Sequence, residues 1–135
     1  LAASKWCLDE IITRGDSHPA CTIALGQRLM AALSDLAKKN GIPMRPQGPG
    51  LAFHTVLLKS GAAEGPINDY RDYATRHDAA RWGHLRLMLL EEGVRAIERG
   101  LWSISTTHTD KDIDDTLERA AVAFGRHAAE WKPAK

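Results

Sequence analysis

The spacing of apolar residues changes once along this chain, after Asn40 and Gly41, and the change constrains the fold. Before this point apolar residues recur at helical intervals, in two runs separated by Gly15 and by His18-Pro19. Gly41 can adopt the left-handed backbone conformation that ends a helix. We therefore expect two amphipathic helices within residues 1–40, the second carrying the apolar face Ile23, Leu25, Leu29, Met30, Leu33 and Leu36.

Beyond residue 41 the pattern is typical of short strands. Residues 51–58 are mostly apolar, with aromatic and β-branched side chains, and predict a β-strand. Residues 42–46 can form only an edge strand, because Pro43 and Pro46 have no N–H group to donate to a neighbour. Residues 94–97 and 101–105 are two further strand candidates. The sequence does not show the regular alternation of strands and helices that is typical of a parallel sheet. An antiparallel sheet is therefore expected.

Polar residues mark where the later helices begin. Asn68 or Asp69 can start a short helix, and Asp78 can cap the next, which ends at Gly93. Thr109 begins a capping box for the last helix. The fold class predicted is α+β, a small, mostly antiparallel sheet of three to four short strands packed with four to five helices. We expect two parts, a helical segment over residues 1–40 and a small domain over residues 41–135.

The composition is that of an ordinary globular domain. The chain has 135 residues, 44% of them apolar and 26% charged, with a formal net charge of +1. This balance argues against disorder and against a nucleic-acid-binding arm, and no apolar run is long enough to span a membrane. Cys7 and Cys21 lie among apolar helical residues, so we expect buried free thiols in a reducing compartment and a cytoplasmic protein.

The histidines do not predict a metal site. None of the six lies four residues from another or near a cysteine at ligand spacing, so solvated or locally hydrogen-bonded side chains are expected. His54 lies inside the apolar strand, where alternation places it on a solvent-facing or domain-interface side. Trp102 is the tryptophan that we expect to face a neighbouring domain.

Arg95 and Arg99 are the candidate binding residues. They bracket a short connection at an expected sheet edge, and a guanidinium can hold a carboxylate through two parallel hydrogen bonds. The alternative is an ordinary surface ion pair with a nearby glutamate, Glu91, Glu92 or Glu98.

Five segments, in the same order, resemble the C-terminal part of class III pyridoxal-phosphate aminotransferases, the family that includes glutamate-1-semialdehyde aminomutase. They are residues 1–12, 48–53, 68–78, 90–94 and 108–117. Between residues 93 and 108 the semialdehyde mutases usually show a Pro-Ser loop, whereas this chain has Glu98-Arg99-Gly100-Leu101-Trp102. That departure favours an aminotransferase over the mutase.

The resemblance implies a fold-type-I enzyme that acts on an amino or keto carboxylate as a homodimer. In the family, pyridoxal 5'-phosphate and its Schiff-base lysine belong to a large domain. No lysine here has that setting, so the resemblance implies no catalytic or cofactor-binding residue in this chain. Some relatives bind the substrate carboxylate with an arginine of the small domain, and Arg95 and Arg99 fall in that stretch as candidate substrate-binding residues.

The chain opens in mid-helix without an initiator Met, so we expect a segment of a longer enzyme that supplies domain closure and dimer packing and is inactive alone. Neither nucleic acid nor a membrane is an expected partner. A stand-alone, non-catalytic α+β interaction domain is the main alternative. A fragment of a metal-dependent hydrolase is a third.

Overall fold

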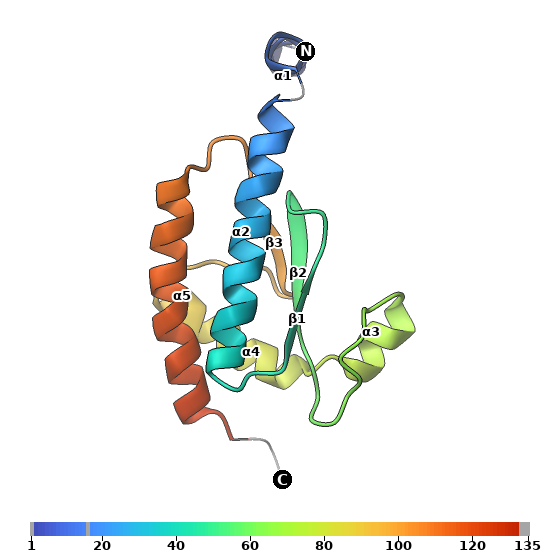
Figure 1. Cartoon of the computed structure of the whole chain (residues 1–135), viewed down its shortest axis with the longest axis vertical. Coiled ribbons are helices and arrows are strands. Elements are labelled where there is room, and N and C mark those ends of the chain that lie inside the picture. Colours follow the sequence, from blue (N-terminus) through green and yellow to red (C-terminus); the bar gives the residue numbers. More distant parts are fainter. Residues whose placement is uncertain (1, 16, 133–135) are drawn as a thin grey trace.

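The computed structural model describes residues 2–15 and 17–132, which form helices around a small sheet (Figure 1). Five α-helices and three β-strands lie in this described part. In chain order they are α1 (Ala2–Arg14), α2 (Ser17–Lys39), β1 (Met44–Gln47), β2 (Ala52–Leu57), α3 (Tyr70–Arg76), α4 (Ala79–Glu91), β3 (Leu101–Ser103) and α5 (Asp110–Glu130).

The sheet is antiparallel, with β2 in the centre and β1 and β3 beside it. In the register between the strands Gln47 is opposite His54, and Phe53 is opposite Trp102. Helices and an antiparallel sheet therefore share one fold, and the predicted α+β class is confirmed.

The prediction of a strand over residues 94–97 is wrong. Gly93, with φ of +80°, ends α4, and the N–H of Val94 donates to the carbonyl oxygen of Leu89 at 2.8 Å. The Gly100 N–H then donates to the Ile97 oxygen at 2.8 Å, which closes a tight turn. Local bonds therefore occupy backbone groups that a strand would offer to a neighbour.

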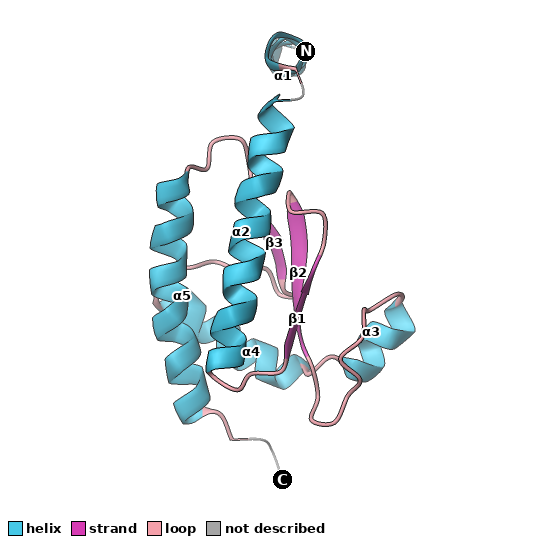
Figure 2. Cartoon of the chain, viewed as in Figure 1, coloured by secondary structure: helices cyan, strands magenta, loops and turns pink. Residues whose placement is uncertain are grey.

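The helices cover the sheet unequally. Helices α2 and α5 lie side by side on one side of the β-hairpin, whereas α3 lies on the other side (Figure 2). Helix α2 shares one core with the sheet and with α4 and α5. The largest fully buried apolar side chains of that core are Leu29, Leu33, Phe53, Leu57, Leu85, Leu89, Ile113 and Phe124.

Two glycines let α2 approach the hairpin closely. A Cβ atom built on Gly26 would lie 2.0 Å from the carbonyl oxygen of Gly50, a distance that no side chain could tolerate. Gly50 itself has φ of +96°, a conformation that favours glycine. The hairpin loop therefore rests directly on the helix backbone.

The helix starts at residues 69, 78 and 109 follow the sequence prediction. Asp69 and Asp78 cap α3 and α4 through their side chains, and Thr109 forms the expected capping box with Asp112 at the start of α5. Helix α2 begins at Ser17, earlier than expected, so Pro19 lies in its first turns, where proline is tolerated.

Helix α1 leaves much of its apolar surface uncovered. Trp6, Leu8, Ile11 and Ile12 are all at least 59% exposed. Cys7 and Cys21 are free, as expected, but both are exposed, so the prediction of buried thiols is wrong. No helix in the described ranges has the length and apolar character needed to cross a membrane.

A pair of histidines joins the middle of α4 to the last turn of α5. His127 of α5 is fully buried, and its Nδ1 atom lies 2.9 Å from Nδ1 of His84 of α4. The His127 ring stacks on Trp131, with centroids 5.6 Å apart, and its Nε2 atom has no hydrogen-bond partner among the described residues. The pKa of His127 is lowered from 6.5 to about 4, mainly by burial and then by the charges of His84 and Arg81, against a smaller opposing effect of Asp78.

We predict that the free energy of unfolding decreases as the pH falls from 6.5 towards 4. In this range the unfolded chain binds a proton at His127 that the folded chain excludes, so acid favours unfolding, by on the order of 3 kcal/mol. Urea denaturation at several pH values measures the effect. The variant His127→Phe should flatten this part of the curve, whereas His108→Gln, which removes an exposed histidine, should leave it. An equally steep curve for His127→Phe would exclude this origin.

Candidate functional site

The open face of the sheet contains a groove of about 580 Å³. Its floor is formed by Ala52, His54 and Val56 of β2 and by Leu101 of β3. These β2 residues alternate with Phe53, Thr55 and Leu57, whose side chains are buried. Because α2 and α5 lie on the other side of the hairpin, the groove is left to α3 and the loop before it, which contribute Ile67, Tyr70 and Tyr73 (Figure 2).

Arg99 lines this groove and is exposed. Among the described residues its guanidinium makes no ion pair and no hydrogen bond. Its carbonyl oxygen lies 3.4 Å from Nδ1 of His54. Burial raises the pKa of the Tyr73 hydroxyl, and the positive charge of Arg99 acts in the opposite direction. The Arg99 charge therefore acts on the side of the groove that α3 forms.

Gly100 fixes the backbone beside Arg99. Its φ is +81°, and its carbonyl oxygen accepts a hydrogen bond of 2.8 Å from the Thr55 N–H. A Cβ atom at this position would lie 2.4 Å from the Thr55 carbonyl oxygen. Only glycine satisfies both the backbone conformation and the contact, so the corner that carries Arg99 is held against the central strand.

Arg95 lies elsewhere. It is exposed and lines a second cavity of about 520 Å³ beside β3, together with His108, Asp112 and Arg119. The structure therefore separates the two candidate arginines, and Arg99 alone faces the groove on the sheet.

The alternative of simple surface ion pairs does not hold for these arginines. Glu91 and Glu92 pair with Arg126 of α5, at 2.8 and 3.0 Å. Among the described residues no ion pair joins the Glu98 carboxylate to Arg95 or Arg99. Sequence reasoning did not identify Arg126 as the partner of these glutamates. Arg126 lies 35 residues after Glu91 in the sequence and meets it only because α5 packs against α4.

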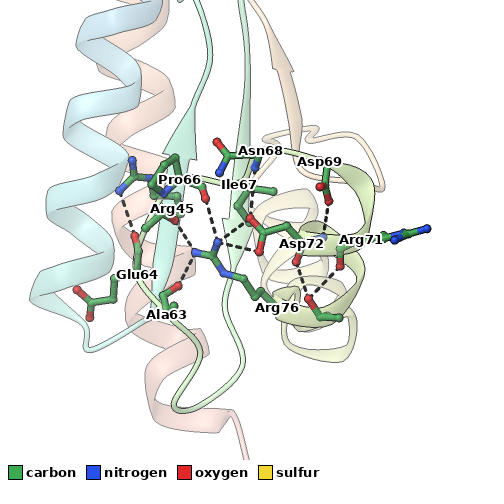
Figure 3. Close-up of polar contacts among 12 residues, drawn as sticks. Arg45, Ala63, Glu64, Pro66, Ile67, Asn68, Asp69, Arg71, Asp72 and Arg76 are labelled. Atoms are coloured by element: carbon green, nitrogen blue, oxygen red, sulfur yellow. Dashed lines mark hydrogen bonds and ion pairs between the residues drawn. The ribbon is translucent and has the colours of Figure 1, made fainter.

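Arg76 holds the α3 wall of the groove in place (Figure 3). Its guanidinium donates to both carboxylate oxygens of Asp72, at 3.0 and 2.9 Å, and to the carbonyl oxygen of Pro66 at 2.9 Å. It also donates to the carbonyl oxygens of Ala63 and Gly65. The hydrogen bond from Arg76 holds the pKa of Asp72 below its ordinary value. The Asp72–Arg76 spacing of four residues was the available sequence signal.

Gln47 fastens the same loop to the sheet. Its side-chain amide donates to the carbonyl oxygen of Ile67 at 2.7 Å and accepts from the Ile67 N–H at 3.0 Å. Arg76 and Gln47 therefore preorganise one side of the groove without a hydrophobic core beneath it, since no residue of α3 is fully buried.

His54 is exposed on the open face, as the strand alternation predicts. The expectation that Trp102 faces a neighbouring domain is wrong. Its ring is 7% exposed and stacks parallel to Phe53 with centroids 6.1 Å apart, and its indole N–H donates to Oγ1 of Thr55 at 3.0 Å. Alternation along β3 places it on the helix-covered face.

The groove lacks the groups that would hold pyridoxal phosphate covalently. A Schiff base requires a lysine amine, and no lysine lines this groove. The residues that line this groove therefore do not fit that cofactor by themselves. The described residues also contain no group of three or more His, Cys, Asp or Glu side chains placed to hold a metal ion.

Comparison with known proteins places this chain among aminotransferase-like segments. It is 32% identical over 104 residues to the glutamate-1-semialdehyde 2,1-aminomutase of Acetivibrio thermocellus, covering 76% of this chain and 22% of the aminomutase. The aminomutase of Chloroflexus aggregans is 28% identical over 108 residues, covering 77% and 24%. No family model matches the chain.

Solved structures agree in fold. An omega-transaminase from Sphaerobacter thermophilus has a TM-score of 0.72 at 21% identity, covering 88% of this chain and 26% of its own. A beta-phenylalanine aminotransferase from Variovorax paradoxus has a TM-score of 0.66 at 26% identity, covering 82% and 24%. A transaminase with PLP bound has a TM-score of 0.63 at 24% identity, covering 81% and 23%. These matches confirm the predicted resemblance to pyridoxal-phosphate aminotransferases and aminomutases. The chain spans about a quarter of their length.

We predict that Gly100→Ala destabilises the fold by about 2 kcal/mol or more, because the new Cβ meets the Thr55 carbonyl and the backbone conformation becomes strained. Urea denaturation measures the change. Gly83→Ala is the matched control, since nothing lies within 4 Å of a Cβ built there in α4, and it should stabilise by about 0.5–1 kcal/mol. Equal effects of the two substitutions would contradict the role of Gly100.

We predict that Arg76→Met loosens the groove wall while the core stays folded, because the substitution removes every hydrogen bond that the guanidinium makes to Asp72 and to the loop. Amide hydrogen exchange should accelerate over residues 63–76 and stay unchanged in α2 and α5. Arg71→Met, on the same helix but with no role in the clamp, is the control. Unchanged exchange in this segment would show that the clamp does not hold it.

Proposed function

We propose that this chain is the C-terminal part of a longer class III pyridoxal-phosphate aminotransferase that acts on an amino or keto carboxylate, and that Arg99 binds the substrate carboxylate. The observation that carries the proposal is the unpaired Arg99 guanidinium in the groove of a segment that resembles transaminases. An aminomutase reaction, the migration of the amino group within one substrate, is the second candidate, favoured by the names of the two curated aminomutases to which the chain is similar.

The proposed role of Arg99 follows from the chemistry of its side chain. A guanidinium presents parallel N–H donors to a carboxylate and remains charged at any physiological pH. An arginine already engaged by a glutamate would have to exchange one carboxylate for another, whereas Arg99 has no acidic partner within the described ranges. Gly100 and Thr55 fix its backbone, so the ordering cost of binding falls mainly on the side chain.

We assign the cofactor to the part of the enzyme outside this chain, together with the lysine that binds it. In this proposal residues 1–40 lead from the large domain, and residues 41–135 form the small domain that closes the substrate cleft. The exposed apolar residues of α1, such as Trp6 and Ile12, support a further surface that covers them. We also propose that the enzyme is a homodimer of the cytoplasm and that this segment alone is inactive.

A stand-alone interaction domain remains the competing proposal, and the single core shared by α2, the sheet and α5 supports it. The intact mass of the native gene product, before and after borohydride reduction, separates the two proposals. A product several-fold larger than this chain that gains a pyridoxyl-phosphate adduct supports the aminotransferase. A product of this size without an adduct supports the interaction domain.

We predict that Arg99→Ala in the full-length enzyme raises KM for the carboxylate substrate by about 10- to 100-fold, because a charge-assisted bidentate contact is lost. Steady-state kinetics measure the effect. Arg95→Ala, which removes an equally exposed arginine from the other cavity, is the matched control and should leave KM within about twofold of the original value. A larger effect of Arg95→Ala would transfer the role to that residue.

A further inference from the structure

We propose that the groove selects substrates with an uncharged, ring-sized side group, and that Tyr70 and Tyr73 of α3 are the residues that determine this specificity. The inference rests on the proposed function, because it takes the Arg99 end of the groove as the place of the substrate carboxylate. It concerns the remainder of the groove, which the resemblance leaves unassigned.

The lining of the groove is apolar apart from a few groups. Beside the exposed ring of His54 the floor offers Ala52, Val56 and Leu101, and the sides offer Pro49, Ile67 and the two tyrosines. Its volume of about 580 Å³ lies in the range of small-molecule sites and is large enough for an aromatic ring. A methyl-sized side group would leave most of this apolar surface in contact with water.

Few polar side chains of the groove are available to bind a charged group on the substrate other than its carboxylate. The Gln47 amide is already paired with the backbone of Ile67 in both directions. Arg99 is the one lysine or arginine among the groove residues, and no aspartate or glutamate lines it. A side group with its own carboxylate would therefore lack a second guanidinium and would meet only the imidazole of His54, whose Nδ1 atom lies 3.4 Å from the Arg99 carbonyl oxygen. A side group with an amine would lack a counter-charge.

The tyrosines form a row of stacked rings. Tyr70 and Tyr73 have centroids 6.3 Å apart, and Tyr73 stacks on His77 at 4.7 Å with an angle of 20° between the rings. Tyr70 is 75% exposed, which is unusual for an aromatic side chain with no partner beyond its neighbour. A substrate ring placed on the groove floor would extend this row. It would replace the water that now contacts the Tyr70 ring with an aromatic contact.

The wall that carries the tyrosines is preorganised. Arg76 ties α3 to the loop before it (Figure 3). Gln47 ties that loop to β1. A ligand therefore need not order this segment on binding, so contacts with the tyrosine rings contribute to affinity. This arrangement suits a residue that discriminates between side groups better than a mobile loop would.

The test uses the full-length enzyme with its cofactor and three amino carboxylates that differ only in the side group, which is phenyl, methyl or carboxymethyl. We expect kcat/KM to be highest for phenyl, by about 10-fold over methyl. Tyr73→Ala should remove this preference by lowering the value for phenyl alone. Tyr73→Phe should keep it, and Arg99→Ala should lower all three values. Because Tyr73 is half-buried, Tyr70→Ala serves as the second variant and should reduce the preference without affecting the fold.

A binding measurement separates this inference from the proposed function. Calorimetric titration of the cofactor-free enzyme with 3-phenylpropanoate and with butanoate should show tighter binding of the first, and Tyr73→Ala should abolish the difference. An enzyme that forms the pyridoxyl adduct but prefers the methyl or carboxymethyl substrate, with no change on tyrosine substitution, would overturn the inference alone. An enzyme with no adduct and no turnover of any substrate would overturn the proposed function, and equal binding of the two acids would then overturn the inference as well.

Discussion

The arrangement of the site depends on one buried side chain, Thr55 of the central strand. Its backbone N–H donates to the carbonyl oxygen of Gly100 at 2.8 Å, and its hydroxyl donates to the same oxygen at 3.3 Å while accepting the Trp102 indole N–H at 3.0 Å. Thr55 as a whole is 1% exposed, so water cannot reach its hydroxyl to replace these hydrogen bonds. The corner that carries Arg99 is thereby fixed to the sheet through a polar group whose loss would leave several partners unsatisfied.

The two faces of the sheet are stabilised by different forces. On the helix-covered face Phe53, Leu57 and Trp102 pack into one apolar core with α2, α4 and α5, where burial provides the stabilisation. On the open face α3 buries no residue completely and is held by hydrogen bonds from Arg76 and Gln47. Such a wall can be firmly placed and still leave its apolar and aromatic side chains available to a ligand, which a wall made by hydrophobic packing could not do.

Local signals in the sequence predicted the parts of the structure that depend on near neighbours. The caps at Asp78 and Thr109 and the central strand are read from side chains within a few residues. The strand predicted over residues 94–97 is wrong because two local signals compete there, and the turns at Gly93 and Gly100 outweigh the β-propensity of Val94 and Ile97.

Contacts between distant segments could not be predicted in this way. Arg126 takes Glu91 and Glu92 away from the candidate arginines, and His84 meets His127 across 43 residues of sequence. The exposure of Cys7 could not be predicted for the same reason. An apolar helical pattern predicts that a helix face can be buried, but it does not say whether another segment of this chain packs against that face. The groove also could not be predicted from local signals, because distant segments form it: β2 and β3 provide the floor and α3 provides the wall.

Arg95 and Arg99 show why a site cannot be inferred from spacing alone. They are four residues apart and carry the same guanidinium group, and the resemblance to aminotransferases does not distinguish them. The chain reverses between them through the Ile97–Gly100 turn, so that Arg95 is left beside α5 and Arg99 reaches the open face of the sheet. The residue that distinguishes them is Gly100. Its carbonyl oxygen accepts a hydrogen bond from the Thr55 N–H, and its backbone adopts a conformation that favours glycine. The cavity that each guanidinium lines is thus decided by the turn between the two arginines, and Gly100 fixes the end of that turn.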